Sequence, residues 1–306
     1  MAKAVRFDSY GGSEVLYLAD VPIPHPPEGE VLVSVRAAGL NPGEASIRQG
    51  YLDAQFPAAF PSGEGSDLAG VVTEVGPGVT SFDVGDEVLG WTDRRASHAE
   101  YVLVPEDHLV VKPEGLAWEV AGGLFVAGTT AFAAVRAVCA GADDTVAVSA
   151  AAGGVGSIVV QLLRIRGATV IGIASEANHA WLESLGATAV SYGEGLADRI
   201  RAAAPNGLDA FIDTFGEEYV HLAVELGVDP SRIETIIAFE AAGAVGAKAD
   251  GSATAATTEV LAELAALAAG GRIVVPIAAT YPLEQVREAY GVLERRHTRG
   301  KIVLVP

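Results

Sequence analysis

The stretch from Thr145 to Gly156 constrains the fold more than any other part of this chain. A short run rich in β-branched residues, Thr-Val-Ala-Val, leads into Ser-Ala-Ala-Ala-Gly-Gly-Val-Gly, and apolar residues at helical spacing follow. Small residues let the backbone turn sharply and let a pyrophosphate come close, and the helix start offers unpaired N–H groups to that anion. The segment therefore predicts a dinucleotide site in which Ala151 replaces the first glycine of G-x-G-x-x-G. The residues that we expect at the coenzyme are Ala152, Gly153, Gly154, Val155 and Gly156.

Strands continue to alternate with helical segments after this turn. Short apolar runs lie at 168–173, 189–192, 209–214 and 232–238, with amphipathic stretches between them. This alternation predicts an α/β fold with a parallel, doubly wound sheet and right-handed crossovers. A small-residue turn in some other α/β fold is the alternative.

The N-terminal part of the chain follows a different pattern. Valine-rich runs between glycines and prolines predict a β-rich domain of turns and a partial barrel. These runs are residues 30–36, 70–75, 87–90, 99–104 and 109–112.

The C-terminal part is predicted to return to this β-rich domain. We expect a helix at 257–269, a strand at 272–277, a helix at 283–295 and a strand at 301–305. The domain boundaries that follow are 1–117 with 271–306 for the β-rich domain, and 118–270 for the dinucleotide-binding domain.

Composition narrows the function classes. The chain of 306 residues has a formal charge of −19, which disfavours a nucleic-acid or anionic-membrane surface. It contains no uninterrupted apolar run of about 18 residues and no N-terminal apolar signal region. Its single cysteine, Cys139, excludes an intrachain disulfide. We therefore expect a cytoplasmic protein with no nucleic-acid or membrane partner.

Several separated motifs resemble one known family. In order along the chain, they are Ala37–Gly50, Ser66–Gly90, Gly128–Phe132, Ala150–Gly156 and Gly300–Leu304. With these motifs the chain resembles the zinc-independent quinone oxidoreductases of the medium-chain dehydrogenase/reductase superfamily. The resemblance implies a GroES-like β domain, a Rossmann domain and a homodimer.

The positions that resemble zinc ligands carry other residues. The related alcohol dehydrogenases use a Cys, then a Gly-His-Glu, then a third ligand. Here those regions read Leu40-Asn41-Pro42-Gly43 and Ser62-Gly63-Glu64-Gly65, with no Cys or His. We therefore expect no metal. Without a Lewis acid to stabilise an alkoxide, a quinone or conjugated enone is the better hydride acceptor because it spreads the arriving charge.

The end of the second strand of the dinucleotide unit distinguishes NAD from NADP. An acid there would bond to the ribose 2′-OH and repel a 2′-phosphate, but this chain has Ser175. Ser175 and Tyr192 resemble the serine and tyrosine of the NADP-binding members, although Tyr192 also fits an ordinary strand-end aromatic residue. Glu176 is evidence for NAD, because a short turn could aim it at the ribose. We expect NADP(H).

The basic residue of the NADP pattern is missing. Asn178 and His179 occupy its place and could still donate hydrogen bonds to a phosphate, although His179 also fits a solvent-facing helix position. Arg296 in the C-terminal part resembles a phosphate-binding arginine of some members.

The resemblance also suggests residues near the chemistry, in a pocket between the domains. Asn41 could orient the nicotinamide carboxamide or a substrate carbonyl, or could be an ordinary turn residue before Pro42. Ser46 stands where some relatives have a tyrosine, so protonation would fall to a weak acid or to water. Arg48 could orient an anionic substrate, but a salt bridge with Glu44 four residues away is the expected arrangement.

Two further residues are expected at the coenzyme. Thr130 resembles a family contact and also fits a helix N-cap. Phe239 follows the last strand of the dinucleotide unit at its carboxyl end, where open α/β sheets bind ligands.

These observations favour an NADPH-dependent enzyme that reduces small, apolar quinones or α,β-unsaturated carbonyls by hydride transfer. The alternative within enzymes is an enoyl-thioester reductase. A nucleotide-binding structural or regulatory protein with little turnover is the alternative outside them, because binding and catalysis share the same turn.

Overall fold

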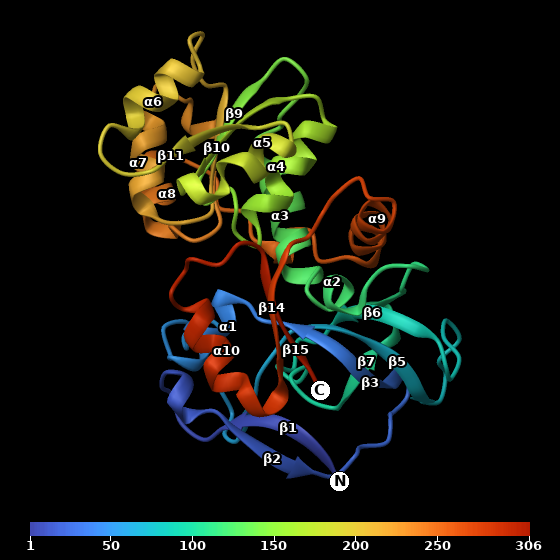
Figure 1. Ribbon diagram of the computed structural model, residues 1–306. Helices are drawn as coiled ribbons and strands as arrows, with labels where there is room; N and C mark the ends of the chain where they lie inside the picture. Colours follow the sequence, from blue (N-terminus) through green and yellow to red (C-terminus); the bar gives the residue numbers. More distant parts are fainter. The chain divides into compact units, whose positions relative to one another are not determined.

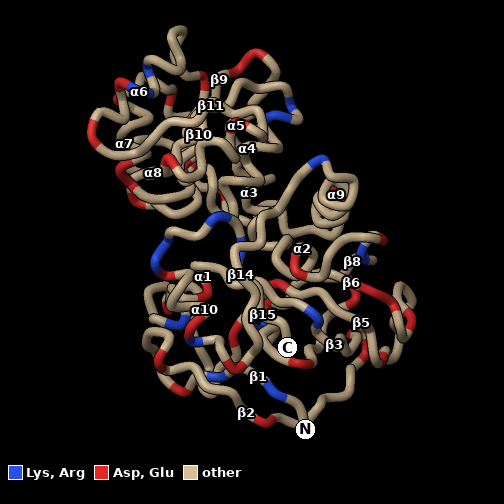
Figure 2. Tube along the Cα trace, viewed as in Figure 1, with Lys and Arg blue, Asp and Glu red and all other residues tan.

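The computed structural model describes residues 1–306 and divides the chain into two compact units (Figure 1). The first comprises Met1–Val126, Thr257–Gly271 and Pro276–Pro306, and the second comprises Ala127–Ala256 and Arg272–Val275. Compared with the boundaries expected from the sequence, the first unit extends from 117 to 126 and also takes in residues 257–270. The reason is that helix α9 (Thr258–Ala269) packs against β8 (Leu109–Val111) of the first unit. Acidic residues are spread over both units (Figure 2).

The first unit is built mainly on antiparallel strands. A three-stranded sheet has the order β2-β1-β4, and a seven-stranded sheet has the order β14-β15-β3-β5-β6-β8, with β7 paired to β3. Besides β8, the strands of these two sheets are β1 (Ala2–Phe7), β2 (Tyr17–Val21), β3 (Glu30–Gly39), β4 (Ser62–Gly63), β5 (Asp67–Val75), β6 (Glu87–Trp91), β7 (Tyr101–Pro105), β14 (Ile277–Pro282) and β15 (Lys301–Val305). The β-rich domain of turns is therefore confirmed.

The C-terminal part joins this unit through β15, which pairs parallel with β14 and antiparallel with β3. The strand predicted at 272–277 is wrong, because β14 begins only at Ile277. The side chain of Gln161 explains the difference. Its Nε2 donates to the Val274 carbonyl at 2.8 Å and its Oε1 accepts from the Val274 N–H at 2.7 Å. A side-chain amide thus takes the place of a neighbouring strand.

Five helices complete the first unit or link to the second. They are α1 (Pro42–Arg48), α2 (Trp118–Gly122), α3 (Phe125–Ala137), α9 and α10 (Val286–Leu293). The helix predicted at 257–269 is confirmed, with the Thr257 hydroxyl accepting from the Val260 N–H at 3.3 Å as its N-cap. No helix has both the length and the apolar character needed to cross a membrane.

The second unit has a five-stranded sheet, all parallel, with the order β11-β10-β9-β12-β13. Its strands are β9 (Thr145–Val148), β10 (Thr169–Ala174), β11 (Thr188–Ser191), β12 (Ala210–Asp213) and β13 (Ile233–Thr235), and its helices are α4 (Gly156–Ile165), α5 (His179–Ser184), α6 (Leu196–Ala203), α7 (Glu217–Glu225) and α8 (Phe239–Val245). Figure 1 shows the alternation of strand and helix. The order reverses between β9 and β12, which confirms the doubly wound Rossmann sheet and marks where such sheets bind ligands.

Candidate functional site

The turn between β9 and α4 has the geometry expected of a pyrophosphate cradle. Its hydrogen bonds use the N–H of Ala151, which donates to Ile173 O at 3.0 Å, and the N–H of Gly153, which donates to Ala150 O at 2.8 Å. The N–H groups of Gly154 and Val155 have no acceptor within the chain. Two free donors at the positive end of a ten-residue helix suit an anion. The residues present therefore fit a dinucleotide.

Crowding explains why the turn needs small residues. A Cβ added to Gly156 would lie 2.3 Å from the Ala150 carbonyl oxygen, while one added to Gly153 would lie 3.2 Å from the same atom. Ala151 and Ala152 are buried, so the turn packs on the sheet through their methyl groups. The replacement of the first fingerprint glycine by Ala151 thus leaves the turn intact.

A buried carboxylate ties the carboxyl ends of three strands together beside this turn. Asp213, which ends β12, accepts from the Ser149 hydroxyl at 2.6 Å and from the Thr235 hydroxyl at 2.8 Å. It also accepts from the N–H groups of Phe215 and Gly216. Burial raises the pKa of Asp213, and these donors oppose that rise. The strand ends at the switch point are therefore held rigidly in register.

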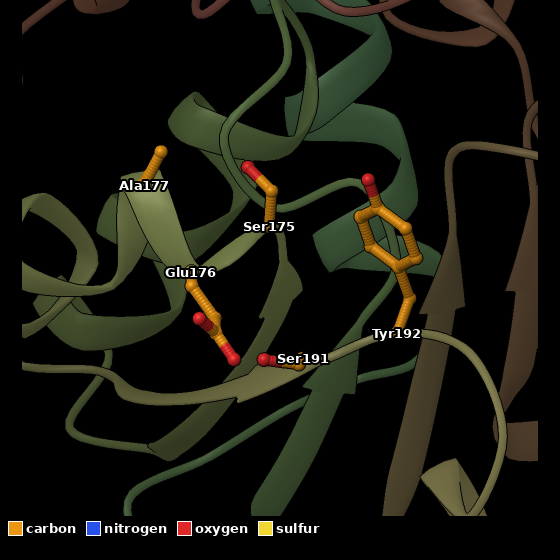
Figure 3. Close-up of a pocket in the computed structure, with 5 residues that line it drawn as sticks. All are labelled: Ser175, Glu176, Ala177, Ser191 and Tyr192. Carbon is orange, nitrogen blue, oxygen red and sulfur yellow. The ribbon is translucent and has the colours of Figure 1, made fainter.

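A pocket of about 410 Å³ lies at the carboxyl ends of β10 and β11. Its walls are Ser175, Glu176, Ala177, Ser191 and Tyr192 (Figure 3). The structure thus brings together Ser175 and Tyr192, which the sequence separates by a helix. In Figure 3 the Glu176 carboxylate points toward Ser191, whereas the hydroxyls of Ser175 and Tyr192 point to the opposite side.

Asn178 and His179 contact two hydroxyls that line this pocket. Asn178 Nδ2 donates to Ser175 Oγ at 3.0 Å, and His179 Nε2 lies 3.4 Å from Ser191 Oγ. Because the Ser175 oxygen already accepts a hydrogen bond, its O–H remains able to donate to a ligand. Both residues therefore orient pocket hydroxyls and are not themselves walls of the pocket.

The remaining residues expected at the coenzyme differ in their burial and in the elements that carry them. Thr130 is buried within α3, which begins at Phe125, so the helix N-cap alternative for Thr130 is wrong. Phe239 is the first residue of α8, is 56% exposed, and borders a second pocket of about 250 Å³. Arg296 is exposed in the loop after α10 with a φ of 57°.

The N–H and both side-chain polar atoms of Asn41 form hydrogen bonds with other residues of the chain. Its N–H and Nδ2 donate to the Glu44 carboxylate at 2.9 and 3.0 Å, and Nδ2 also reaches Asp67 Oδ2 at 3.3 Å. Its Oδ1 accepts from Lys301 Nζ at 2.5 Å. Asn41 is also the N-cap of α1, and its N–H bond to the Glu44 side chain is part of a capping box there. This buried setting favours the turn and capping role over an amide contact with coenzyme or substrate. Ser46, by contrast, is partly exposed and donates only to Pro42 O at 3.3 Å.

The predicted Arg48–Glu44 salt bridge is wrong. Arg48 is fully buried and pairs with Glu64 and with Glu294, each at 2.7 Å, while its guanidinium lies over the Tyr290 ring. Glu44 instead accepts from the Tyr290 hydroxyl at 2.9 Å. The chain thus satisfies both charges with partners that are distant in sequence, and Arg48 is not available to a substrate.

Burial shifts the acidities of this cluster in the first unit. Desolvation raises the pKa of Glu64 to about 8 despite the nearby charge of Arg48, and it raises that of Asp67 to about 6 despite Lys301. Lys301 donates to Leu40 O at 2.8 Å and lies 3.4 Å from Asp67 Oδ2. Three buried carboxylates, of Glu44, Glu64 and Asp67, therefore surround two buried cations.

Sequence reasoning missed two of these groups. Lys301 begins β15 immediately before its apolar run, and Asp213 ends the apolar run of β12. A single charge at the end of a buried strand was the available signal, because such a charge requires specific partners.

Two family models match the chain. Residues 27–114 match the "alcohol dehydrogenase GroES-like domain", and residues 185–304 match "zinc-binding dehydrogenase". A zinc site does not fit this chain, because it has no group of three or more His, Cys, Asp or Glu side chains that could hold a metal ion.

Full-length relatives are similar to the chain. The NADPH-dependent alkenal/one oxidoreductase of Arabidopsis thaliana chloroplasts is 32% identical over 99% of this chain and 79% of the relative. The quinone oxidoreductase of Sus scrofa is 30% identical over 100% of this chain and 98% of the relative.

Solved structures agree. The quinone oxidoreductase from Coxiella burnetii has a TM-score of 0.90 at 32% identity, over 100% of this chain and 99% of that one. The Escherichia coli quinone oxidoreductase complexed with NADPH has a TM-score of 0.88 at 26% identity, over 99% and 100% of the two chains.

A GroES-like unit combined with a dinucleotide-binding Rossmann sheet defines the medium-chain dehydrogenases and reductases, oxidoreductases that use NAD(P). Within that superfamily, this chain belongs to the quinone oxidoreductase family.

Proposed function

We propose that this protein is an NADPH-dependent, zinc-independent reductase of quinones or α,β-unsaturated carbonyls. The observation that carries the proposal is the pocket at the ends of β10 and β11. It offers the hydroxyls of Ser175 and Tyr192 where a coenzyme's adenosine ribose would lie, next to the glycine turn. The names of its relatives, an NADPH-dependent alkenal/one oxidoreductase and quinone oxidoreductases, support the substrate class.

In this proposal the chain's residues bind and orient the coenzyme. Bound NADPH supplies the hydride. The free N–H groups of Gly154 and Val155 would hold the pyrophosphate at the start of α4. Ser175, whose oxygen accepts from Asn178, would donate a hydrogen bond to the 2′-phosphate, and Tyr192 would add a second hydroxyl. No charged side chain of the chain stabilises the reduced acceptor in this proposal, which suits acceptors whose conjugation spreads the charge.

Consumption of NADPH tests the enzymatic proposal. Absorbance at the reduced nicotinamide band is followed with 9,10-phenanthrenequinone, a simple enone and an enoyl thioester. We expect turnover with the quinone or the enone. Turnover confined to the thioester would replace the proposed substrate class, and tight NADPH binding without any turnover would favour a structural or regulatory protein.

Substitution in the turn tests the binding mode. Gly153→Val places a branched side chain in the pyrophosphate space, so we expect the Kd for NADPH to rise at least tenfold. Gly141→Val is the matched control, because a Cβ at Gly141 has its nearest neighbour 3.9 Å away. Equal affinity in the two variants would show that the pyrophosphate lies elsewhere.

Two further expectations belong to the same proposal. A homodimer is supported only by the family resemblance, and sedimentation equilibrium of the full chain measures it directly. A cytoplasmic location is consistent with the lack of a membrane-spanning helix and is tested by fractionation.

A further inference from the structure

Arg199 is fastened to the loop that carries Tyr192. It projects from α6 and reaches back over the turn after β11. Its Nε donates to Ser191 O at 2.9 Å, its Nη1 to Glu194 O at 2.8 Å, and its Nη2 to both Tyr192 O and Gly193 O at 3.2 Å. One guanidinium therefore holds four consecutive carbonyl groups, of which two belong to walls of the pocket.

The charge of Arg199 has no carboxylate partner within the chain. All four of its acceptors are neutral carbonyls. Arg201, two residues along the same helix, shows the usual alternative, since it pairs with Asp198 at 3.1 Å and Glu225 at 3.2 Å. A protein of net charge −19 has an excess of acids with which to neutralise a surface arginine. An unneutralised guanidinium behind a pocket wall is therefore a local source of positive potential.

The sequence lacks the lysine or arginine expected three or four residues after Ser175, where Asn178 and His179 stand. We propose that Arg199 replaces that cation as the residue that sets the preference for a ribose 2′-phosphate. It acts as a positioning residue, because it fixes the backbone of Tyr192 and places a positive charge against the backbone of two wall residues without lining the pocket. This inference rests on the proposed use of NADPH.

The test compares two arginines of one helix. Kd values for NADPH and NADH are measured with the full-length protein and with Arg199→Gln, Arg199→Lys and Arg201→Gln, the last serving as the control for loss of one surface charge. Adenosine 2′,5′-bisphosphate and AMP serve as probes that lack the nicotinamide. Thermal unfolding of each variant reports whether it folds.

We expect Arg199→Gln to weaken NADPH and the bisphosphate about tenfold while NADH and AMP change less than about twofold. Arg199→Lys should fall between wild type and Arg199→Gln, because it keeps the charge and loses most of the carbonyl contacts. Arg201→Gln should leave the ratio of the two coenzyme affinities unchanged.

Two results would overturn the role of Arg199. Equal weakening of NADPH and NADH would show that the arginine only maintains the loop, and an unchanged Kd for NADPH would show that it is not involved. If Arg199→Gln does not fold, the same readings in Arg199→Lys decide. Wild-type protein that binds NADH as tightly as NADPH would instead refute the proposed coenzyme, a result visible before any variant is made.

Discussion

At the scale of single residues, Gly156 in the coenzyme turn has no room for a side chain. A Cβ there would meet the carbonyl oxygen of Ala150 at 2.3 Å and its carbonyl carbon at 2.9 Å, both backbone atoms. We expect Gly156→Ala to lower the free energy of unfolding by about 1–3 kcal/mol, because the turn must shift. Gly243→Ala, with nothing within 4 Å of its Cβ in α8, should raise it by about 0.5–1 kcal/mol. Urea denaturation measures both, and equal stabilities would contradict the crowding argument.

Glu234 has a buried carboxyl group with a raised pKa and incomplete hydrogen bonding. The carboxyl is fully buried in β13, its Oε1 accepts from the Asp250 N–H at 2.6 Å, and its Oε2 has no partner. Burial raises its pKa to about 8. The hydrogen bond from the Asp250 N–H and the charge of Lys248 oppose this rise, while the negative charge of Asp250 adds to it. The folded protein therefore binds a proton at pH values where the unfolded chain has lost it.

The sign of the pH dependence follows from this raised pKa. Between about pH 5 and 8 the unfolded chain releases this proton freely while the folded protein retains it, so the free energy of unfolding falls as pH rises. We expect Glu234→Gln to become progressively more stable relative to wild type across this range. Urea midpoints at pH 5, 6, 7 and 8 give the difference, in which the shared titration of Glu64 and Asp67 cancels. A constant difference between the two proteins would show that Glu234 does not titrate there.

At the scale of elements, Tyr290 joins α10 to α1. Its hydroxyl donates to Glu44, whose carboxylate also accepts from the backbone N–H groups of Asn41 and Ser66. We expect Tyr290→Phe to cost about 1.5–3 kcal/mol of unfolding free energy, because a buried carboxylate loses one of its donors. Tyr281→Phe in β14 is the matched control, since no hydrogen bond of the Tyr281 hydroxyl is present. The prediction fails if the two variants unfold at the same urea concentration.

What the sequence could predict at this scale depended on how local the cause was. The strand, turn and helix around Gly153 follow from neighbouring residues, and the structure has them where the pattern indicates. Val274 shows the opposite case, because its apolar run reads as a strand until the distant Gln161 side chain takes its backbone groups. Arg48 likewise pairs with residues 16 and 246 positions away in the sequence and not with the nearby Glu44. Such contacts depend on tertiary packing, which periodicity does not encode.

At the scale of the whole molecule, the domain composition was predictable and the boundaries were less so. Helix α9 is amphipathic whichever unit it joins, so its pattern alone did not assign it. Its packing on β8 places it with the first unit. The chain passes from the first unit to the second within α3, after Val126. The candidate site followed the same rule, because Ser175 and Tyr192 could be predicted individually and their common pocket only through the parallel pairing of β10 with β11.

The net charge of −19 makes a prediction about coenzyme association. NADPH is itself a polyanion, so the acidic protein repels it over distances comparable to the Debye length, about 10 Å at 0.1 M salt. We expect the association rate constant for NADPH, measured by stopped-flow fluorescence, to rise severalfold as ionic strength increases from about 10 to 200 mM. NADH carries less charge and should show a smaller rise. An association rate that falls with added salt would mean that the positive potential of the helix start and Arg199 outweighs the charge of the whole protein along the approach path.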